Sequence, residues 1–557
     1  AAVEQGLFLT RSEEPGCYEL HVLARELLLA HLEATGPDLL ADLHTRAARW
    51  YDARGHLVLG LRHRLDAGAF REALHALFLH AAALYDSGQE ASVARALEQI
   101  PEEVVRADPV AEIEYAWANV VVDSSTLLDT VDHLVQVAPA RPPELEGGLL
   151  VLRSVAAVHR GQWAECAVLA QEALKTLGAD AGRDTLGRHA WNMVARAAAL
   201  SERWEDEAPE VVAARSGVSV DAPRRLAFEA TRAVGQVLAG RPLVALQAVA
   251  GVRRVVDRPM SILATELALA EAMAYRELGD RERALPLLTA LAERPVTPVP
   301  YAPLLARLEL VAAHLATGHT DSAGRDLAAA ADLVRGHLPG SGSRTWLRVV
   351  ETTFAIAAGD LDRARVAAAE VPDPFWAGVS RARLLLAEGD RPGAEAALAG
   401  ASPVTVRHRV VHGLLTGLAA TEHQHEHGES AMGDALALAS EYGMLQTVAA
   451  MGNRFLDDLE LVASRVPAEW LDRLRRATLP SPVTDSRRAG MVEALTDRER
   501  DVLRMLPSRL TVREIADELG ISTNTLKFHL KTIYRKLEVG SRAEAAELAR
   551  SMTRLRH

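Results

Sequence analysis

One recurring phrase limits what this chain can fold into. A helix-forming run ends at glycine, a short polar turn follows, and a small residue stands five positions after the glycine. Clear copies begin at Gly240, Gly279, Gly318, Gly359 and Gly389. Looser copies begin at Gly161 and at Glu202, which takes the glycine position before Trp204. Most copies lie 38 to 41 residues apart, and a period of about 40 residues is typical of stacked helical hairpins.

The residue types in this phrase have a physical role. Glycine forms a left-handed helix end or a tight turn, and a small residue in the next helix lets two helices approach closely. A single hairpin cannot bury its apolar face, so neighbours must stack into a superhelix with an extended concave surface. Such a surface binds proteins, peptides or small ligands, and all three remain open. We expect the Gly, Ala and Trp positions of the phrase to serve packing alone.

Composition supports a helical chain. Apolar residues make up 49% of the sequence but aromatic residues only 4%, which favours helices rich in Ala and Leu over β-sandwiches. We therefore predict an all-α fold, a tetratricopeptide-like superhelix of helical hairpins. No apolar run approaches the roughly 18 residues of a membrane span. The two cysteines, Cys17 and Cys166, cannot form a disulfide framework, so we expect a cytoplasmic protein with reduced thiols and no membrane partner.

Histidines cluster in the segment 421–430. His423 and His427 stand four positions apart, with His425 and two glutamates beside them. Imidazoles at that spacing can bind a transition metal. A polar hairpin tip with scattered histidines is the commoner arrangement, so we expect no metal site.

Charge divides the chain into two modules. The net charge is −13 overall, which by itself argues against a nucleic-acid partner. Residues 487–557, however, hold 15 basic and 10 acidic residues, so this end carries +5. The chain has only four lysines, and three of them, Lys527, Lys531 and Lys536, fall within ten residues of this end. A small basic module therefore follows a large acidic one.

Helix-start signals give the basic module its outline. Three Ser or Thr residues are each followed three positions later by Glu, the pattern of a capping box. These pairs are Thr496 with Glu499, Thr511 with Glu514, and Ser541 with Glu544. A linker rich in Pro and small polar residues precedes them at 474–488. We expect four helices in about 65 residues.

The third of these helices, 522–538, has two distinct faces. Gly520 allows a tight turn before it, and Ser522 is a natural N-cap. Leu526, Leu530, Ile533 and Leu537 form an apolar stripe, and Lys527, Lys531 and Arg535 form a basic stripe on another face. Four basic residues without an acid favour a polyanionic partner, because like charges four apart destabilise a helix. This pattern predicts a helix-turn-helix that enters the major groove of DNA.

The segment 495–549 resembles the LuxR-type helix-turn-helix. The shared motifs are "LT-x-R-E", then "E-I-A", then "S-x-x-T-[hydrophobic]-K-x-H", "K-L" and "R-x-E-A". The resemblance implies base contacts from Lys527, Phe528 and Lys531, and dimerisation through the helix from Arg542 to Arg550. Pro507 and Arg509 depart from the family pattern in the turn before the second helix. The full set of expected DNA-contacting residues is Thr511, Ser522, Thr523, Asn524, Thr525, Lys527, Phe528, His529, Lys531, Arg535 and Lys536.

The front of the chain resembles another part of the large ATP-binding LuxR-type regulators. Residues 6–32, 43–55 and 64–77 are similar to the stretch after the nucleotide-binding module, where a winged-helix domain leads into a tetratricopeptide-like solenoid. The resemblance implies four parts, which are the end of a winged-helix-like domain (1–34), the solenoid (35–478), a linker (479–491) and the LuxR-type domain (492–557).

A nucleotide site is not expected within this chain. The dipeptide Gly-Lys is absent from the sequence, so no P-loop can hold a triphosphate. ATP is therefore expected as a cofactor only if an ATPase domain lies upstream, and the first residue, Ala1, favours truncation.

These observations predict a transcriptional regulator. We expect dimers on double-stranded promoter DNA, activation of transcription with RNA polymerase as a further partner, and a small molecule or protein bound to the solenoid. The alternative is a protein-interaction scaffold whose last helices form a cap without DNA affinity. An enzyme is not expected, because no nucleophile with a base and no cofactor motif stands out.

Overall fold

The structure of the chain is a computed structural model, and all but two short strands of its regular structure are helices. It describes residues 8–11, 18–86, 89–120, 124–137, 143–178, 185–218, 222–255, 261–293, 299–420, 425–451 and 465–477, and ten residues of the C-terminal segment between Val502 and Ile533. The predicted all-α class is confirmed.

The N-terminal end carries the one β element of the described residues. Strands β1 (Leu9–Arg11) and β2 (Tyr18–Leu20) pair antiparallel, with Leu9 opposite Leu20. Three residues each are too few for an alternating pattern to stand out in the sequence, so the strands were not predicted. Helix α1 (Val22–Thr35) follows, with exposed leucines and no buried residue. The expected boundary of a winged-helix-like domain at residue 34 stays a prediction.

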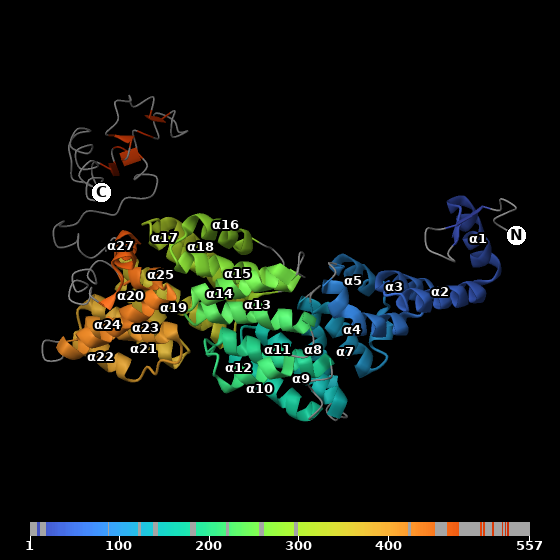
Figure 1. Cartoon of the computed structure of the whole chain (residues 1–557), viewed down its shortest axis with the longest axis horizontal. Helices are drawn as coiled ribbons and strands as arrows, with labels where there is room; N and C mark the ends of the chain where they lie inside the picture. Colours follow the sequence, from blue (N-terminus) through green and yellow to red (C-terminus); the bar gives the residue numbers. More distant parts are fainter. Residues whose placement is uncertain are drawn as a thin grey trace.

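Helices then follow one another in pairs along the long axis of the molecule (Figure 1). The first group is α2 (Pro37–Asp52), α3 (Leu57–Asp66), α4 (Phe70–Asp86), α5 (Glu90–Leu97), α6 (Glu102–Val105), α7 (Pro109–Asn119) and α8 (Ser124–Val137). The second group is α9 (Pro143–His159), α10 (Trp163–Leu177), α11 (Thr185–Leu200), α12 (Pro209–Val218), α13 (Ala222–Leu238), α14 (Pro242–Val255), α15 (Ser261–Glu277) and α16 (Arg281–Ala292).

The last group completes the array. It consists of α17 (Tyr301–Leu315), α18 (Thr320–Gly336), α19 (Ser341–Ala358), α20 (Leu361–Ala369), α21 (Pro374–Glu388), α22 (Arg391–Ala399), α23 (Val406–Ala419), α24 (His425–Tyr442), α25 (Leu445–Ala449) and α27 (Ala468–Ala477). From α9 to α24 each odd-numbered helix packs against the even-numbered helix that follows it. The predicted superhelix of helical hairpins is confirmed.

The recurring phrase behaves as its residue types predict. All six glycines that begin it have a positive φ, from 71° at Gly318 to 91° at Gly240. The small residues five positions later are completely or almost completely buried, namely Cys166, Ala245, Ala284, Ala323, Ala364 and Ala394. Two further copies escaped the sequence analysis, because Gly68 precedes buried Ala73, and Gly443 precedes buried Val448, with the same geometry.

Glu202 occupies the glycine position of its repeat with a φ of 53°. Among the described residues only one other non-glycine, Phe8, has a positive φ. A side chain in this conformation is strained, so a glutamate here needs compensating contacts.

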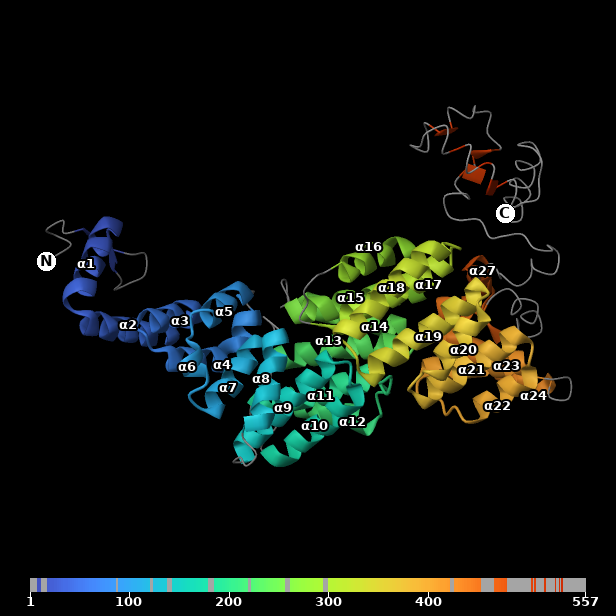
Figure 2. The ribbon, with the colours of Figure 1, turned by 180° about the vertical axis from the view of Figure 1, so that it is seen from behind.

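The array of hairpins curves (Figure 2), and segments far apart in sequence lie side by side, such as α10 with α19 and α15 with α25. The backbone N–H of Gly340 donates to Arg160 O (2.8 Å). The rings of Trp163 and Trp346 lie 5.3 Å apart. Further along, the N–H of Arg407 donates to Ala239 O (2.8 Å). The hairpins therefore enclose space between them.

The one cysteine in the described part of the chain is a packing residue. Cys166 is fully buried, and burial raises the pKa of its thiol to about 12. The thiol therefore stays protonated and unreactive at neutral pH.

Helix length and hydropathy were compared with what a membrane span needs. Among the residues described, no helix is both long and apolar enough to cross a bilayer.

Gly240 and Gly389 offer a test of the closing contact. A Cβ on Gly240 would lie 2.8 Å from both the Arg407 backbone nitrogen and Met444 Sδ, whereas a Cβ on Gly389 meets nothing within 4 Å. Both glycines have a φ near 90°, so alanine at either position costs about 1–2 kcal/mol in backbone strain. We expect Gly240→Ala to lower the free energy of unfolding by about 1–3 kcal/mol more than Gly389→Ala does.

Urea unfolding followed by circular dichroism measures both variants. Equal losses would contradict a close approach of Arg407 to residue 240.

Candidate functional site

A cavity of about 200 Å³ lies between the odd-numbered helices of the last hairpins. Helices α15, α17, α19, α21 and α23 each contribute side chains, and α25 closes one side. The wall is mostly apolar and includes Met273, Leu305, Leu308, Trp346, Val349, Val350, Trp376 and Val411. Charged side chains at the wall are Glu202, Arg276, Glu309, Arg383 and Arg407. A mostly apolar concavity with a few polar groups is the usual form of a small-molecule site.

Glu202 holds one side of this cavity together. Its carboxylate is buried and accepts a hydrogen bond from Trp376 Nε1 (3.2 Å). His408 Nε2 lies 3.1 Å from the same carboxylate. Because the Val404 N–H donates to His408 Nδ1 (3.3 Å), the proton of the neutral ring is on Nε2, which donates to Glu202. These contacts fix the turn after α11 to α21 and α23 and offset the strain at Glu202.

Arg407 joins the end of α13 to the start of α23. Its Nε donates to Leu238 O (2.9 Å) and its Nη2 to Val237 O (3.0 Å). The last carbonyls of a helix have no partner within the helix, and here the guanidinium and the Arg407 N–H supply donors to them. The carbonyl end of α13 thereby faces the amide end of α23, an alignment that also suits the two helix dipoles.

The guanidinium of Arg407 also reaches the end of α15. Its Nη1 donates to Glu277 Oε2 (3.3 Å) and to Thr447 Oγ1 (2.8 Å). The other oxygen of Glu277 accepts from the Thr447 N–H (2.7 Å). Arg276 Nη2 contributes a further bond to Glu277 (3.1 Å) and forms an ion pair with Glu309. We call Arg407, Glu277 and Thr447 the clasp.

The charges of the clasp support one another. Burial alone would raise the pKa of the Glu277 carboxyl, but Arg407 and Arg276, with the hydrogen bonds from Thr447, hold it below its ordinary value of 4.5. Burial raises the pKa of Glu309, although Arg276 acts in the opposite direction. Glu277 is therefore ionised in the folded protein, and its charge is part of what closes the superhelix.

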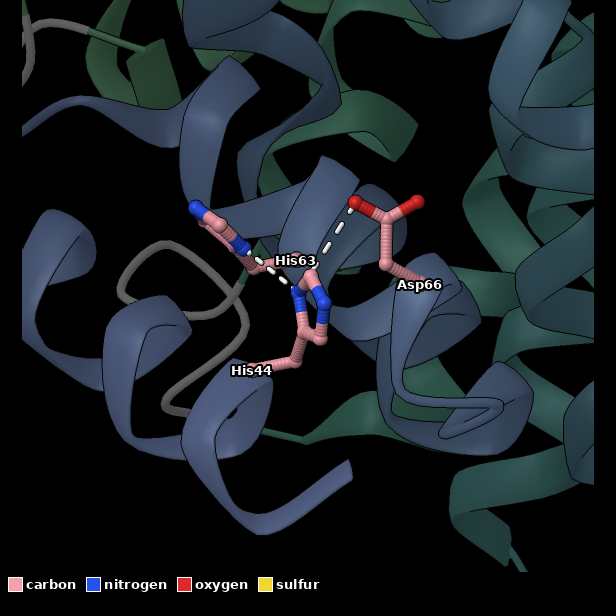
Figure 3. Close-up of side chains that lie close together, drawn as sticks. All are labelled: His44, His63 and Asp66. Atoms are coloured by element: carbon pink, nitrogen blue, oxygen red, sulfur yellow. Dashed lines mark hydrogen bonds and ion pairs between the residues drawn. The ribbon is translucent and has the colours of Figure 1, made fainter. Parts of the chain in front are cut away.

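A separate cluster of His44, His63 and Asp66 lies on α2 and α3 (Figure 3). Figure 3 shows the two contacts of His44 Nδ1, to His63 Nδ1 at 2.8 Å and to Asp66 Oδ2 at 3.8 Å. The ring of Tyr51 stacks on His63, with centroids 5.3 Å apart. Burial, and next the neighbouring His44, lower the pKa of His63.

Imidazoles with a carboxylate are ligands that zinc uses. Here, however, the two Nδ1 atoms face each other at hydrogen-bond distance, so one neutral ring donates and the other accepts. This bond and the stacked Tyr51 account for the cluster as a link between α2 and α3. No sequence pattern predicted it. Of the histidines considered earlier, His427 is exposed on α24, while His423 and the side chain of His425 lie outside the described residues.

The C-terminal segment forms a small apolar core where it is described. Leu526 and Ile533 are 0% exposed and Leu530 is 8% exposed. All three are helical, so the predicted apolar stripe is confirmed for them, and Leu537 lies outside the described residues. Residues of the two preceding predicted helices are buried with them, namely Val502, Leu503, Leu506, Ile515 and Ala516.

The expected DNA-contacting residues lie outside the described part of the chain. They are Thr511, Ser522, Thr523, Asn524, Thr525, Lys527, Phe528, His529, Lys531, Arg535 and Lys536. Their roles stay predictions.

Residues 493–549 match the model of the family described as bacterial regulatory proteins, luxR family. The matched segment contains the buried Leu526, Leu530 and Ile533. Residues 493–549 are a LuxR-type domain. The resemblance found in the motifs is thereby confirmed, and the match begins one residue after the predicted domain start at 492.

Relatives are consistent with the LuxR-type domain. The chain is 43% identical over 82 residues to the probable transcriptional regulatory protein SgaR of Hyphomicrobium methylovorum, covering 15% of this chain and 39% of that protein. It is 24% identical over 209 residues to the HTH-type transcriptional regulator MalT of Vibrio campbellii, covering 32% of this chain and 23% of MalT.

A further relative is named as a kinase. The chain is 26% identical over 165 residues to the serine/threonine-protein kinase PknK of Mycobacterium tuberculosis, covering 28% of this chain and 15% of the kinase. The chain thus spans less than two fifths of the length of each of these three relatives.

Sequence reasoning found the LuxR-type domain but missed the cavity. Glu202 in a glycine position was its one visible signal. Apart from Thr447, the partners of Glu202 and Arg407 described above lie 130 to 206 positions away in sequence, and no spacing rule connects residues at such distances.

The clasp makes a prediction about acid stability. The pKa of the Glu277 carboxyl is lower in the folded protein than its value of about 4.5 in the unfolded chain. Its ionised form therefore stabilises the fold at any pH above about 4.5. This stabilisation is lost as the pH falls through the folded-state pKa. We expect Glu277→Gln to lower the free energy of unfolding at pH 7 by about 3 kcal/mol, because Arg407 loses its buried counter-charge. The variant should also lose less stability than the wild type between pH 5 and pH 3.

Urea midpoints at each pH measure both effects. Glu293→Gln, an exposed glutamate after α16, is the control and should match the wild type. A Glu277→Gln variant as stable as the wild type at pH 7 would contradict the clasp.

Proposed function

We propose that this chain is a DNA-binding transcriptional regulator, an activator, that reads the major groove with helix 522–538. The observation that carries the proposal is the LuxR-type domain at residues 493–549. The regulators among its relatives support the same function.

The buried stripe supports the orientation of the reading helix. Side chains on a helix are about 100° apart in projection. Leu526, Leu530 and Ile533 are buried. Around the helix axis, the helical period predicts that Lys527 lies about 100° and Arg535 about 180° from Leu526. The basic residues would then face outward, where phosphates and base edges can be reached.

The remaining partners follow from this function. We propose that the protein acts in the cytoplasm as a homodimer, paired through the last helix, with two reading helices in successive major grooves of promoter DNA. RNA polymerase is the proposed partner in activation. We propose no enzymatic activity, and the similarity to a kinase covers 15% of that kinase.

The solenoid is proposed as the sensor. Its cavity is lined by helices that the clasp draws together, so a ligand there favours the closed superhelix over an open one. Ligand binding that shifts the superhelix between its open and closed forms can thereby influence the LuxR-type domain.

The basic stripe is tested by mutating two of the chain's four lysines. We expect Lys527→Ala/Lys531→Ala to weaken binding by about a hundredfold, because each base or phosphate contact contributes about 1–3 kcal/mol. The slope of log affinity against log salt should fall in magnitude by up to about 2. The measurement is fluorescence anisotropy on duplexes that the wild-type chain enriches from a random library.

Lys175→Ala is the matched control, since Lys175 is the remaining lysine and is exposed on α10. It should bind as the wild type does. Undiminished binding by the double variant, or no duplex enriched by the wild type, would favour the protein-interaction scaffold.

A further inference from the structure

Of the described charged side chains at the cavity wall, all but one contact another ionisable side chain. Among the charged side chains at its wall, Glu202 is bonded to His408 and Trp376, and both Arg276 and Arg407 contact Glu277. Glu309 pairs with Arg276. Each of these groups has its charge or its hydrogen-bonding capacity met within the protein.

Arg383 on α21 differs from them. In the described part of the chain its one polar contact is a hydrogen bond from Nη1 to Thr353 Oγ1 (3.0 Å). The Thr353 hydroxyl is neutral and itself donates to Val349 O (3.0 Å). Among the described residues no carboxylate lies within ion-pair distance of Arg383, whose side chain is partly exposed. Burial lowers the pKa of its guanidinium to about 10. The group is still charged at neutral pH.

An arginine in this setting costs the folded protein free energy. Removing a cation from water without a counter-charge is unfavourable, and buried charges in proteins are normally paired. The guanidinium offers several N–H donors in a planar fork that matches the two oxygens of a carboxylate. Thr353 occupies only part of this fork. Arg383 lines the cavity, and the two described glutamates at the wall, Glu202 and Glu309, are engaged by other residues.

The rest of the cavity limits the ligand further. Its volume of about 200 Å³ is below the usual range of roughly 300–1,000 Å³ for ligand pockets, so the ligand is small. Trp346, Trp376, Leu305 and Leu308 offer apolar surface to its body.

We propose that this cavity binds a small organic carboxylate, whose carboxylate pairs with Arg383 and whose apolar body packs against Trp346 and Trp376. The proposal rests on the sensor role proposed above for the solenoid, and it names the class of ligand. The wall includes residues of α15, α17, α19, α21, α23 and α25, so the ligand bridges elements that the clasp brings together.

The experiment measures binding to the full chain. The probes are phenylacetate, indole-3-acetate and hexanoate, each compared with its neutral primary amide. Titration calorimetry gives affinities, and quenching of tryptophan fluorescence reports on Trp346 and Trp376. We expect at least one acid to bind about ten- to a hundredfold more tightly than its amide, the usual range for a hydrogen bond to a charged group.

Variants separate a ligand-binding role from a structural one. Arg383→Met should abolish the preference for the acid over the amide while leaving the melting temperature of the free chain unchanged or raised, because an unpaired charge is removed. Arg383→Lys should retain part of the preference. Arg381→Met removes an exposed arginine of the same helix and should bind as the wild type does.

Three results would overturn the proposal. These are no binding of any acid, equal binding of acid and amide, or an Arg383→Met variant that keeps the preference. A lower melting temperature of Arg383→Met with unchanged binding would assign Arg383 a structural role instead. None of these measurements uses DNA, so a failure here is distinct from a failure of the lysine variants to weaken DNA binding.

Discussion

The meeting of α13 with α23 is the contact on which the closed superhelix depends. Hairpins that touch only their neighbours form an open spiral whose curvature is the sum of small angles. Here the final carbonyls of α13 find donors on Arg407, and the same side chain holds Glu277 at the end of α15. Hydrogen bonds that satisfy buried helix ends are costly to break, so Arg407 stabilises the closed form of the array.

Enclosure changes the chemistry available to the inner helices. An open concave surface would leave Glu202 and Arg383 in water, where their charges need no partner. Once α21 and α23 close over the earlier hairpins, Glu202 requires the donors on Trp376 and His408. Polar groups in such a place are either satisfied by the protein or available to a ligand. Glu202 belongs to the first kind and Arg383 to the second.

Local patterns predicted the parts of this protein that depend on neighbours in sequence. The Gly-to-Ala spacing predicted the hairpins because a left-handed turn and a close helix crossing require those residue types. The stripe of Leu526, Leu530 and Ile533 likewise follows from the helical period. The clasp and the cavity join residues of hairpins that lie far apart in sequence, and no local pattern encodes which of them meet. Even the paired strands Leu9–Arg11 and Tyr18–Leu20 were too short to leave a pattern.

The clasp can form only late in the synthesis of the chain. Arg407 follows its acceptor Leu238 by 169 residues, and ribosomes add about 5–20 residues per second, so α13 waits roughly 10–30 s for its partner. During that interval the hairpins from α9 to α22 must hold together without Arg407, through their neighbours and through contacts such as that of Trp163 with Trp346. The continuous apolar core from Ile113 to Phe354 suits this order of events, because it forms before the residue that closes the superhelix has been made.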